Sequence, residues 1–183
     1  MSASAPINRK LSAGFTLVEV IISFTILTLA LGGFSGMVFS GIHGFRQSQE
    51  SYLASAIAQE GMELAQNKKD NSVQCITADP NCPLANWQDN LLGDFQVDAT
   101  QLGQLAPQGK FPAFVANNYI CILPSTSNKS GFFSYCGNGS YLGAGYTREV
   151  SITSLNSYSV SVITTVRWGN GKSLALQSIL FSN

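Results

Sequence analysis

The sequence predicts an α+β protein in which one long N-terminal helix packs on a C-terminal antiparallel β-meander. Two patterns carry this prediction. An uncharged apolar run from Val20 to Phe45 leads into apolar residues at helical spacing, whereas the chain from Tyr146 onward alternates apolar and polar residues. The 183 residues, of which only 11% are charged, are enough for one modest domain and an apolar anchor.

The apolar run is long enough to cross a membrane. Its 26 residues without a formal charge exceed the roughly 20 that a spanning helix requires. Arg9 and Lys10 precede it, so we expect the N-terminus in the cytoplasm and the C-terminal part outside. An ordinary secretory signal places a small-residue cleavage site after its apolar core, whereas Gly14 lies before it. Cleavage at Gly14 would therefore keep the anchor in the mature protein.

Glu19 is the unusual residue of this segment, because it places one carboxylate near the start of the apolar run. A charge inside a bilayer costs roughly 2.5 to 3.5 kcal/mol by insertion scales, so Glu19 needs a partner. A second copy of the chain, or a relative of it, is the expected source. The alternative is a lone glutamate tolerated near the membrane surface of a plain signal anchor.

The order of basic leader, Gly14, Phe15 and then Glu19 as the fifth residue of an apolar run resembles the prepilin signal of type IV pilins and type II secretion pseudopilins. The likeness is specific over residues 9–31, fair over residues 32–69 and only architectural beyond. It implies a ladle-shaped subunit that is cleaved after Gly14 by a prepilin peptidase, methylated on the new amino group of Phe15 and assembled into a helical filament. In that filament Glu19 would meet the amino terminus of Phe15 on a neighbouring subunit, and an α-amino group is largely cationic at neutral pH.

Small residues recur every four positions along the helix and predict a contact surface for other helices. They are Thr28, Gly32, Gly36, Ser40, Gly44 and Ser48. The alternative is the ordinary tolerance of transmembrane helices for glycine. Many pilins carry a proline in this region, which is absent here, and each helical glycine costs about 1 kcal/mol relative to alanine. We therefore expect bending or local unwinding between Gly32 and Gly44 in a filament.

The predicted domain plan has a leader at 1–14, an anchor helix at 15–45, its amphipathic continuation at 46–70, a loop-rich region at 71–144 and the meander at 145–183. In the continuation, Leu53, Ile57, Gly61 and Leu64 share one face with Ala54, Ala58 and Ala65. This face should cover the sheet. Lys68 and Lys69 suit the negative end of the helix dipole, and Asp70–Ser72 is predicted as the stop.

Short strands are predicted at Phe95–Ala99 and Tyr119–Leu123 within the loop-rich region, where Gly, Pro and Asn are frequent. The meander is predicted at Tyr146–Thr153, Tyr158–Trp168 and Ser173–Phe181, with turns at Asn156 and at Gly169-Asn170-Gly171. Val160, Val162, Val166 and Trp168 alternate with Ser159, Ser161, Thr165 and Arg167. Arg148 is interpreted as a surface charge, and Trp168 as a core or rim aromatic.

Four cysteines, Cys75, Cys82, Cys121 and Cys136, follow the anchor, on the side where oxidation is expected. Three pairings are open, and sequence proximity favours Cys75 with Cys82 and Cys121 with Cys136. Free thiols and a zinc site are the alternatives. Zinc is disfavoured because Cys-x-x-Cys pairs and nearby histidines are absent.

The sequence offers little support for catalysis, a cofactor or a nucleic-acid surface. Gly171-Lys172-Ser173 ends like a phosphate-binding loop, but Val166 stands where that motif needs its first glycine. The single histidine, His43, belongs to the apolar segment, so no Ser-His-Asp arrangement forms beyond it. Asp79, Asp89, Asp94 and Asp98 lack the calcium-loop pattern, although a calcium site stays open. Without residues 1–14 the chain has eight basic and ten acidic residues.

Two functions of different class follow. The first is a filament subunit of the bacterial cytoplasmic membrane, later part of a periplasmic or cell-surface filament for adhesion, motility, DNA uptake or secretion. The resemblance implies as its partners other pilin or pseudopilin subunits, the prepilin peptidase, an inner-membrane assembly platform and a cytoplasmic motor ATPase. The second is a monomeric ectodomain, held by an uncleaved anchor, that acts as a binding module.

Overall fold

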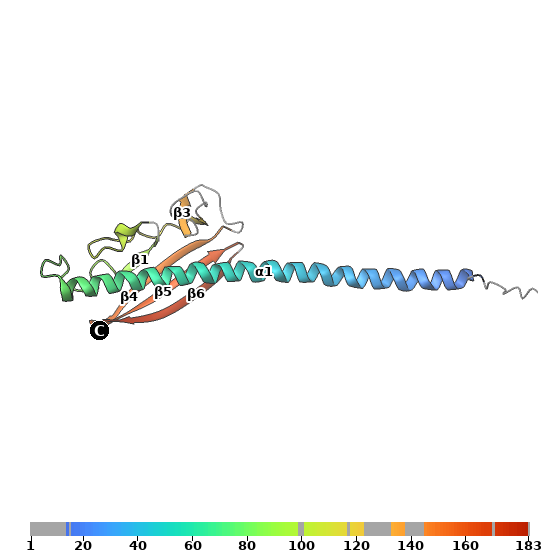
Figure 1. The fold of residues 1–183 in the computed structure, drawn as a ribbon, viewed down its shortest axis with the longest axis horizontal. Coiled ribbons are helices and arrows are strands. Elements are labelled where there is room, and N and C mark those ends of the chain that lie inside the picture. Colours follow the sequence, from blue (N-terminus) through green and yellow to red (C-terminus); the bar gives the residue numbers. More distant parts are fainter. Residues whose placement is uncertain are drawn as a thin grey trace, which may run out of the picture. The chain divides into compact units, whose positions relative to one another are not determined.

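The computed structural model describes residues 14, 16–98, 101–116, 118–122, 133–137, 145–169 and 171–182, without the side chains of residues 102, 122, 136 and 137. Phe15, most of the leader and the side chain of Cys136 therefore lie outside the described part. The chain divides into two compact units, Met1–Gln47 and Ser48–Asn183. Helix α1, Leu17–Ala78, contributes its first half to one unit and its second half to the other (Figure 1). The second unit is called the head below.

Helix α1 begins with a capped turn and ends later than the sequence predicts. The Thr16 hydroxyl accepts a hydrogen bond from the Glu19 backbone N–H at 3.3 Å, as an N-cap does. The predicted stop at Asp70–Ser72 is wrong, because Ser72 is buried and donates to the Lys68 carbonyl at 3.0 Å, which keeps it inside the helix. The helix ends at Ala78, two residues before Pro80, which cannot continue it.

The head contains a four-stranded antiparallel sheet in the order β1-β4-β5-β6. Its strands are β1 (Gly93–Phe95), β4 (Thr147–Asn156), β5 (Ser159–Trp168) and β6 (Lys172–Phe181). The three long strands are consecutive in the chain, so the predicted meander is confirmed. Gly169 and Gly171 both have positive φ values, of 53° and 82°, in the turn between β5 and β6.

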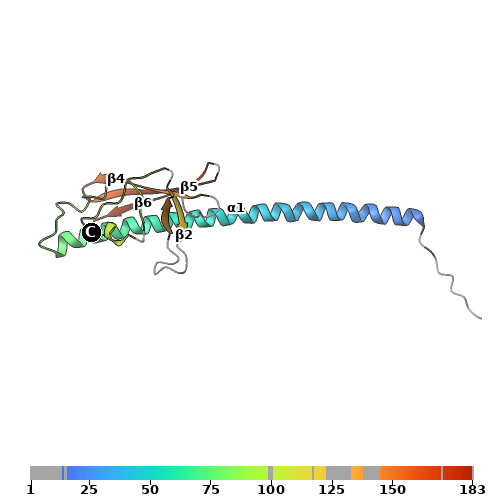
Figure 2. The same ribbon diagram turned by 90° about the horizontal axis from the view of Figure 1, so that it is seen from above.

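A second, two-stranded sheet pairs β2 (Tyr119–Ile122) with β3 (Phe133–Gly137). The sequence predicts β2 closely but misses β3, a five-residue strand. The strand predicted at Phe95–Ala99 lies two residues earlier, at β1, because the backbone from Gln96 turns to pair with Pro112 instead. A short 3-10 helix, η1 (Leu102–Gln104), precedes the loop that packs on α1. Figure 2 shows β4–β6 on one side of α1, and β2 is joined to the residue before β4 because Ile120 N–H donates to the Tyr146 carbonyl at 2.8 Å.

The core lies between one face of α1 and the inner face of the sheet. Val160, Val162 and Val166 are fully buried and Trp168 is 6% exposed, which confirms the predicted apolar face of β5. Ser159 and Ser161 on the opposite face are buried as well, so burial alternates only toward the end of the strand, at Thr165 and Arg167. On α1 the buried positions follow helical spacing, as predicted, and continue past Ala65 to Lys68 and Ser72. They form two clusters with the sheet, one around Leu64, Trp87 and Val162, the other around Ile57, Tyr146 and Trp168.

Candidate functional site

The first half of α1, residues 17–47, presents an uncovered apolar surface. Its most hydrophobic 18-residue window has a mean hydropathy of 2.1, and none of that window is buried. By length and composition it is the one helix in the described part of the chain able to cross a membrane. Large side chains such as Leu29, Phe34 and Met37 are two-thirds exposed or more. Such a surface is stable only in lipid or against other apolar chains.

Hydroxyl groups within this segment satisfy their hydrogen bonds inside the helix. Ser23, Thr25 and Ser35 each donate to the carbonyl four residues earlier at 2.8 Å. A hydroxyl bonded in this way does not require water, so these residues are compatible with hydrocarbon. Glu19 is the one acidic or basic residue among residues 17–45, with His43 counted as neutral, and no cation of this segment neutralises it.

Glu19 lies in the first turn of α1, where the positive end of the helix dipole favours a carboxylate. The turn and the Thr16 cap help to explain why this position tolerates an acid. However, its side chain makes no ion pair within the described residues. Phe15, whose amino group is the expected partner, is outside that part.

The predicted stripe of small residues is open on the surface of the helix. A Cβ atom added at Gly32, Gly36 or Gly44 would meet no other heavy atom within 4 Å. Ser40 is exposed as well, and α1 is helical throughout this region. No atom of the described residues fills the space at these glycines.

Gly61 is the opposite case, because the head is built against it. A Cβ atom there would lie 2.8 Å from Arg148 Cδ and 2.9 Å from Thr164 Cγ2. Real Cβ atoms do not approach neighbours so closely, so glycine lets α1 reach the sheet at this point. The sequence places Gly61 on the core-facing side but does not reveal the close approach.

Arg148 is the main correction to the sequence interpretation, since its side chain is fully buried and is not a surface charge. Its guanidinium donates to the Ile57 carbonyl at 3.0 Å, to the Val97 carbonyl, and to Glu60 Oε1 at 3.2 Å. Figure 1 shows the elements it joins: α1, the segment after β1, and β4. Arginine suits this role because its five donors are fixed in one plane.

Tyr135 and Asp98 extend the polar network around Arg148. The Tyr135 hydroxyl donates to the Arg148 carbonyl at 3.1 Å, and its ring centroid lies 6.0 Å from the guanidinium carbon. Asp98, also buried, accepts from the Ser134 hydroxyl at 3.0 Å. Burial raises the pKa of Glu60, although Arg148 opposes the shift, and burial likewise raises the pKa of Tyr135. These contacts hold the β2–β3 hairpin on the head.

Lys68 is also buried, contrary to the expectation that it serves the end of the helix dipole. Its ammonium group donates to the carbonyls of Ala106, Pro107 and Gly109, so its three protons meet three acceptors. Burial lowers the pKa of Lys68 to about 8. Asn71, one turn on, donates to the Leu105 carbonyl at 2.9 Å. The two residues hold the loop at 105–109 against α1.

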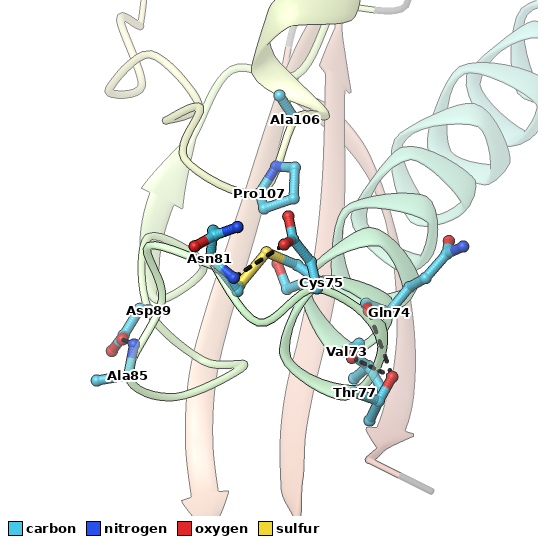
Figure 3. The surroundings of a disulfide bond; sticks show 12 residues. Val73, Gln74, Cys75, Thr77, Asn81, Ala85, Asp89, Ala106 and Pro107 are labelled. Carbon is cyan, nitrogen blue, oxygen red and sulfur yellow. Dashed lines mark hydrogen bonds between the residues drawn. A yellow bond between two sulfur atoms is a disulfide. The ribbon is translucent and has the colours of Figure 1, made fainter.

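A disulfide joins Cys75, in the last turn of α1, to Cys82. Figure 3 shows it next to Pro107, in the loop that Lys68 holds. The Asp79 carboxylate accepts from the Asn81 backbone N–H at 2.9 Å in the same turn. Cys121 is also disulfide-bonded. Its pairing with Cys136 stays a prediction, although Cys136 lies on the neighbouring strand, two residues from Ser134, which pairs with Cys121.

The described residues contain no group of three or more metal-ligating side chains. Gly171-Lys172-Ser173 leads into strand β6 and not into a helix, so it is not a phosphate-binding loop. The shallow hollow beside it is lined by Arg167 and Lys172, and both side chains are occupied by ion pairs, to Glu149 and Glu50.

Together these features define a class: a helix with an exposed membrane-compatible half, followed by a disulfide-bonded α+β head in a pilin-like layout. Residues 9–35 match the model of the prokaryotic N-terminal methylation motif. The chain thus carries the processing signal of type IV pilins and pseudopilins, as the order of Gly14, Phe15 and Glu19 indicates. No curated protein and no solved structure matches the chain.

Proposed function

We propose that this protein is a type IV pilin-like subunit, a minor pilin or pseudopilin, that is processed after Gly14, methylated at Phe15 and polymerised into an extracytoplasmic filament. The observation that supports this most directly is the methylation motif over residues 9–35, followed by an apolar half-helix that no described residue of the chain covers. The proposal assigns a structural role to the chain and no reaction.

Glu19 and the new amino terminus have opposite charges, and each would be costly to place in hydrocarbon alone. Removal of residues 1–14 creates an ammonium group on Phe15, four residues before Glu19. Glu19 has no ion pair within the described residues, so we take a neighbouring subunit as the source of the cation. In hydrocarbon the pair replaces two isolated charges, each of which is costly. Methylation of the amino group leaves its charge in place.

The small-residue stripe supports the same role. Gly32, Gly36, Ser40 and Gly44 leave space for another helix backbone to approach α1 closely. Membrane residence is then a state that precedes assembly, with the N-terminus in the cytoplasm and the head outside. The partners are other pilin or pseudopilin subunits, the prepilin peptidase, the assembly platform and the motor ATPase. Adhesion, motility, DNA uptake and secretion are the roles such a filament serves.

Mass spectrometry of the mature protein tests the processing step. The proposal requires a chain that begins at Phe15 and carries one added methyl group on its amino terminus. An intact chain beginning at Met1, found as the functional form, would support the alternative of a monomeric tethered ectodomain.

Substitution of Glu19 tests assembly. Glu19→Ala should leave the protein in the membrane with a folded head, yet strongly reduce its recovery in filaments sheared from the cell surface or purified from the periplasm. The matched control is Glu63→Ala, which removes an exposed carboxylate from the head half of α1 and should assemble normally. Normal incorporation of the Glu19 variant would contradict the proposed charge pairing.

A further inference from the structure

The two edge strands of the four-stranded sheet differ in whether other segments cover their outer side. The β1 edge is short and covered: Gln96 N–H donates to the Pro112 carbonyl at 2.8 Å, and Phe114 N–H donates to the Asp94 carbonyl at 3.2 Å. Strand β6 forms the other edge, and in the described part of the chain it pairs only with β5. Ten residues of β6 are thus paired on one side alone.

The hydrogen-bond register shows which groups point outward from this edge. Ser182 N–H donates to the Tyr158 carbonyl at 2.9 Å, which makes this pair a hydrogen-bonded one. Hydrogen-bonded pairs alternate with non-hydrogen-bonded pairs along an antiparallel ladder. The backbone N–H and C=O groups therefore point away from β5 at every second residue of β6, namely at Ser173, Ala175, Gln177, Ile179 and Phe181. The Phe181 carbonyl confirms the assignment, since it accepts a hydrogen bond from Lys69 at 3.2 Å.

Between Ser173 and Ile179, strand β6 lacks the devices that protect natural sheet edges, and lysines lie only at its ends, with Lys172 at the start and Lys69 bonded to the Phe181 carbonyl. Those devices are prolines, bulges, charges along the strand and covering segments. The ten β5–β6 pairs run without a register shift, and residues 173–181 contain no proline and no charge. Lys172, at the start, is held by Glu50 at 2.7 Å. An edge of this kind is a template for another strand.

Apolar side chains flank the free edge on both faces. On the outer face Ile179 and Phe181 are 48% and 57% exposed. On the inner face Leu174 and Leu176 are only partly buried where they pack against the core. An added strand would cover both sets.

We propose that the β6 edge binds β6 of a second copy of this chain, in an antiparallel pair centred on Gln177. In this register Ala175 lies opposite Ile179 of the second copy, and Ser173 lies opposite Phe181, so small residues face large ones. On the inner face Leu174 meets Leu180. Lys172 lies opposite Ser182, so no like charges meet. The outward-pointing residues face one another, and although the Phe181 carbonyl is already bonded to Lys69, the central three positions, Ala175, Gln177 and Ile179, supply about six backbone hydrogen bonds.

The pairing fixes the relative direction of the two heads. Within the head, β6 and α1 run toward the same end (Figure 1). A two-fold antiparallel pair therefore sets the α1 segments of the two heads in opposite directions. Heads that meet from two facing surfaces, such as two membranes or two filaments, can form this contact. The inference goes beyond filament assembly and does not depend on it.

Disulfide crosslinking of the full-length protein in detergent micelles tests the register. Gln177→Cys should form a covalent dimer on oxidation, because residue 177 faces itself across the two-fold axis at a Cα separation of about 5.5 Å. Ala175→Cys and Ile179→Cys should each stay monomeric alone but crosslink when mixed. The unmodified chain, with its native disulfides, gives the baseline.

A proline variant tests the edge itself. Gln177→Pro removes an N–H that does not pair with β5, so the head should fold with an unchanged circular dichroism spectrum while the dimer is lost. Vesicles that display the full-length protein should cluster, as measured by light scattering, and the Gln177→Pro protein should not cluster them. A monomer by light scattering at micromolar concentration, or crosslinking of Ala175→Cys alone, would overturn the proposal. Clustering that survives Gln177→Pro would overturn it as well.

Discussion

The two halves of α1 belong to one helix but are completed by different partners. Between Ala54 and Ser72 buried positions recur at helical spacing, and the polar groups on that face have partners in the head. In residues 17–47 no side chain is buried, and Glu19 has no ion pair within the described residues. The buried face of the head half of α1 is covered by residues of the same chain. The apolar half requires surroundings that the chain does not supply.

The glycines of α1 show the difference between its two halves. Gly61 is enclosed by three side chains of the sheet, whereas Gly32, Gly36 and Gly44 have open space around them. The same residue type, at similar helical spacing, therefore serves an intramolecular contact in one half and is free for an intermolecular one in the other. The following predictions, in order of decreasing effect, separate the two uses.

Removal of the buried guanidinium should damage the head most. Arg148→Ala leaves Glu60 without its cation and the buried Val97 carbonyl without its donor, and should lower the free energy of unfolding by about 3 to 5 kcal/mol. Chemical denaturation followed by tryptophan fluorescence measures it. Arg167→Ala breaks the more exposed pair with Glu149 and should cost less than about 1 kcal/mol. Equal losses in the two variants would show that the Arg148 network is not a stabilising centre.

Gly61→Ala should destabilise the head by about 1 to 3 kcal/mol, because the new methyl group overlaps Arg148 and Thr164. Gly36→Ala is the matched control in the apolar half. It should leave the unfolding transition of the head unchanged and should reduce assembly instead. A head that tolerates Gly61→Ala without loss would contradict the close approach of helix and sheet.

Loss of the Cys75–Cys82 disulfide should cost about 2 kcal/mol, the entropy of closing a short loop in the unfolded chain. The double variant Cys75→Ser/Cys82→Ser and treatment of the native protein with a reducing agent should both lower the melting temperature. Reduction should have the larger effect, because it also opens the Cys121 disulfide. An unchanged melting temperature would count against a stabilising role.

Lys68 should make the free energy of unfolding of the head depend weakly on pH. Since burial lowers its pKa to about 8 in the folded head, the unfolded chain binds more protons between pH 8 and about 10. Stability should therefore rise with pH in this window. Above pH 10 the raised pKa of Tyr135 acts in the opposite direction. The difference between the native protein and Lys68→Met, measured by denaturation at several pH values, isolates the lysine. A difference that does not change with pH would refute the assignment.

Periodicity predicted most of the fold because it reports which face of an element is apolar. The apolar face of β5 and the spacing of Ile57, Gly61 and Leu64 are read directly from the sequence and are confirmed in the core. Strand β3 was missed because a five-residue strand without a clear alternation of apolar and polar residues cannot be distinguished from a loop by its sequence. The end of α1 was missed because the burial of Ser72 and the hydrogen bond from Asn71 to the Leu105 carbonyl outweigh the weak helix propensity of both residues.

The candidate assembly residues stay a prediction, which also depends on a local pattern. Gly14, Phe15 and Glu19 form a local pattern whose meaning depends on order and spacing, and the matched motif covers it. Arg148 and Lys68 carried no such signal. A cation on a strand or a helix is usually solvated, and nothing nearby in the sequence shows that distant carbonyls surround it.

By itself the sequence determined that this protein has an apolar helix with one acid, a cleavage signal before it and a sheet after it, because each depends on neighbouring residues. The tertiary structure alone decided which charges are buried, where α1 ends and which sheet edge stays bare. Those outcomes depend on contacts such as Arg148 with Val97 and Lys68 with Gly109, between residues about 40 to 50 positions apart. Local patterns contain no record of such contacts, since burial is set by what the rest of the chain places nearby.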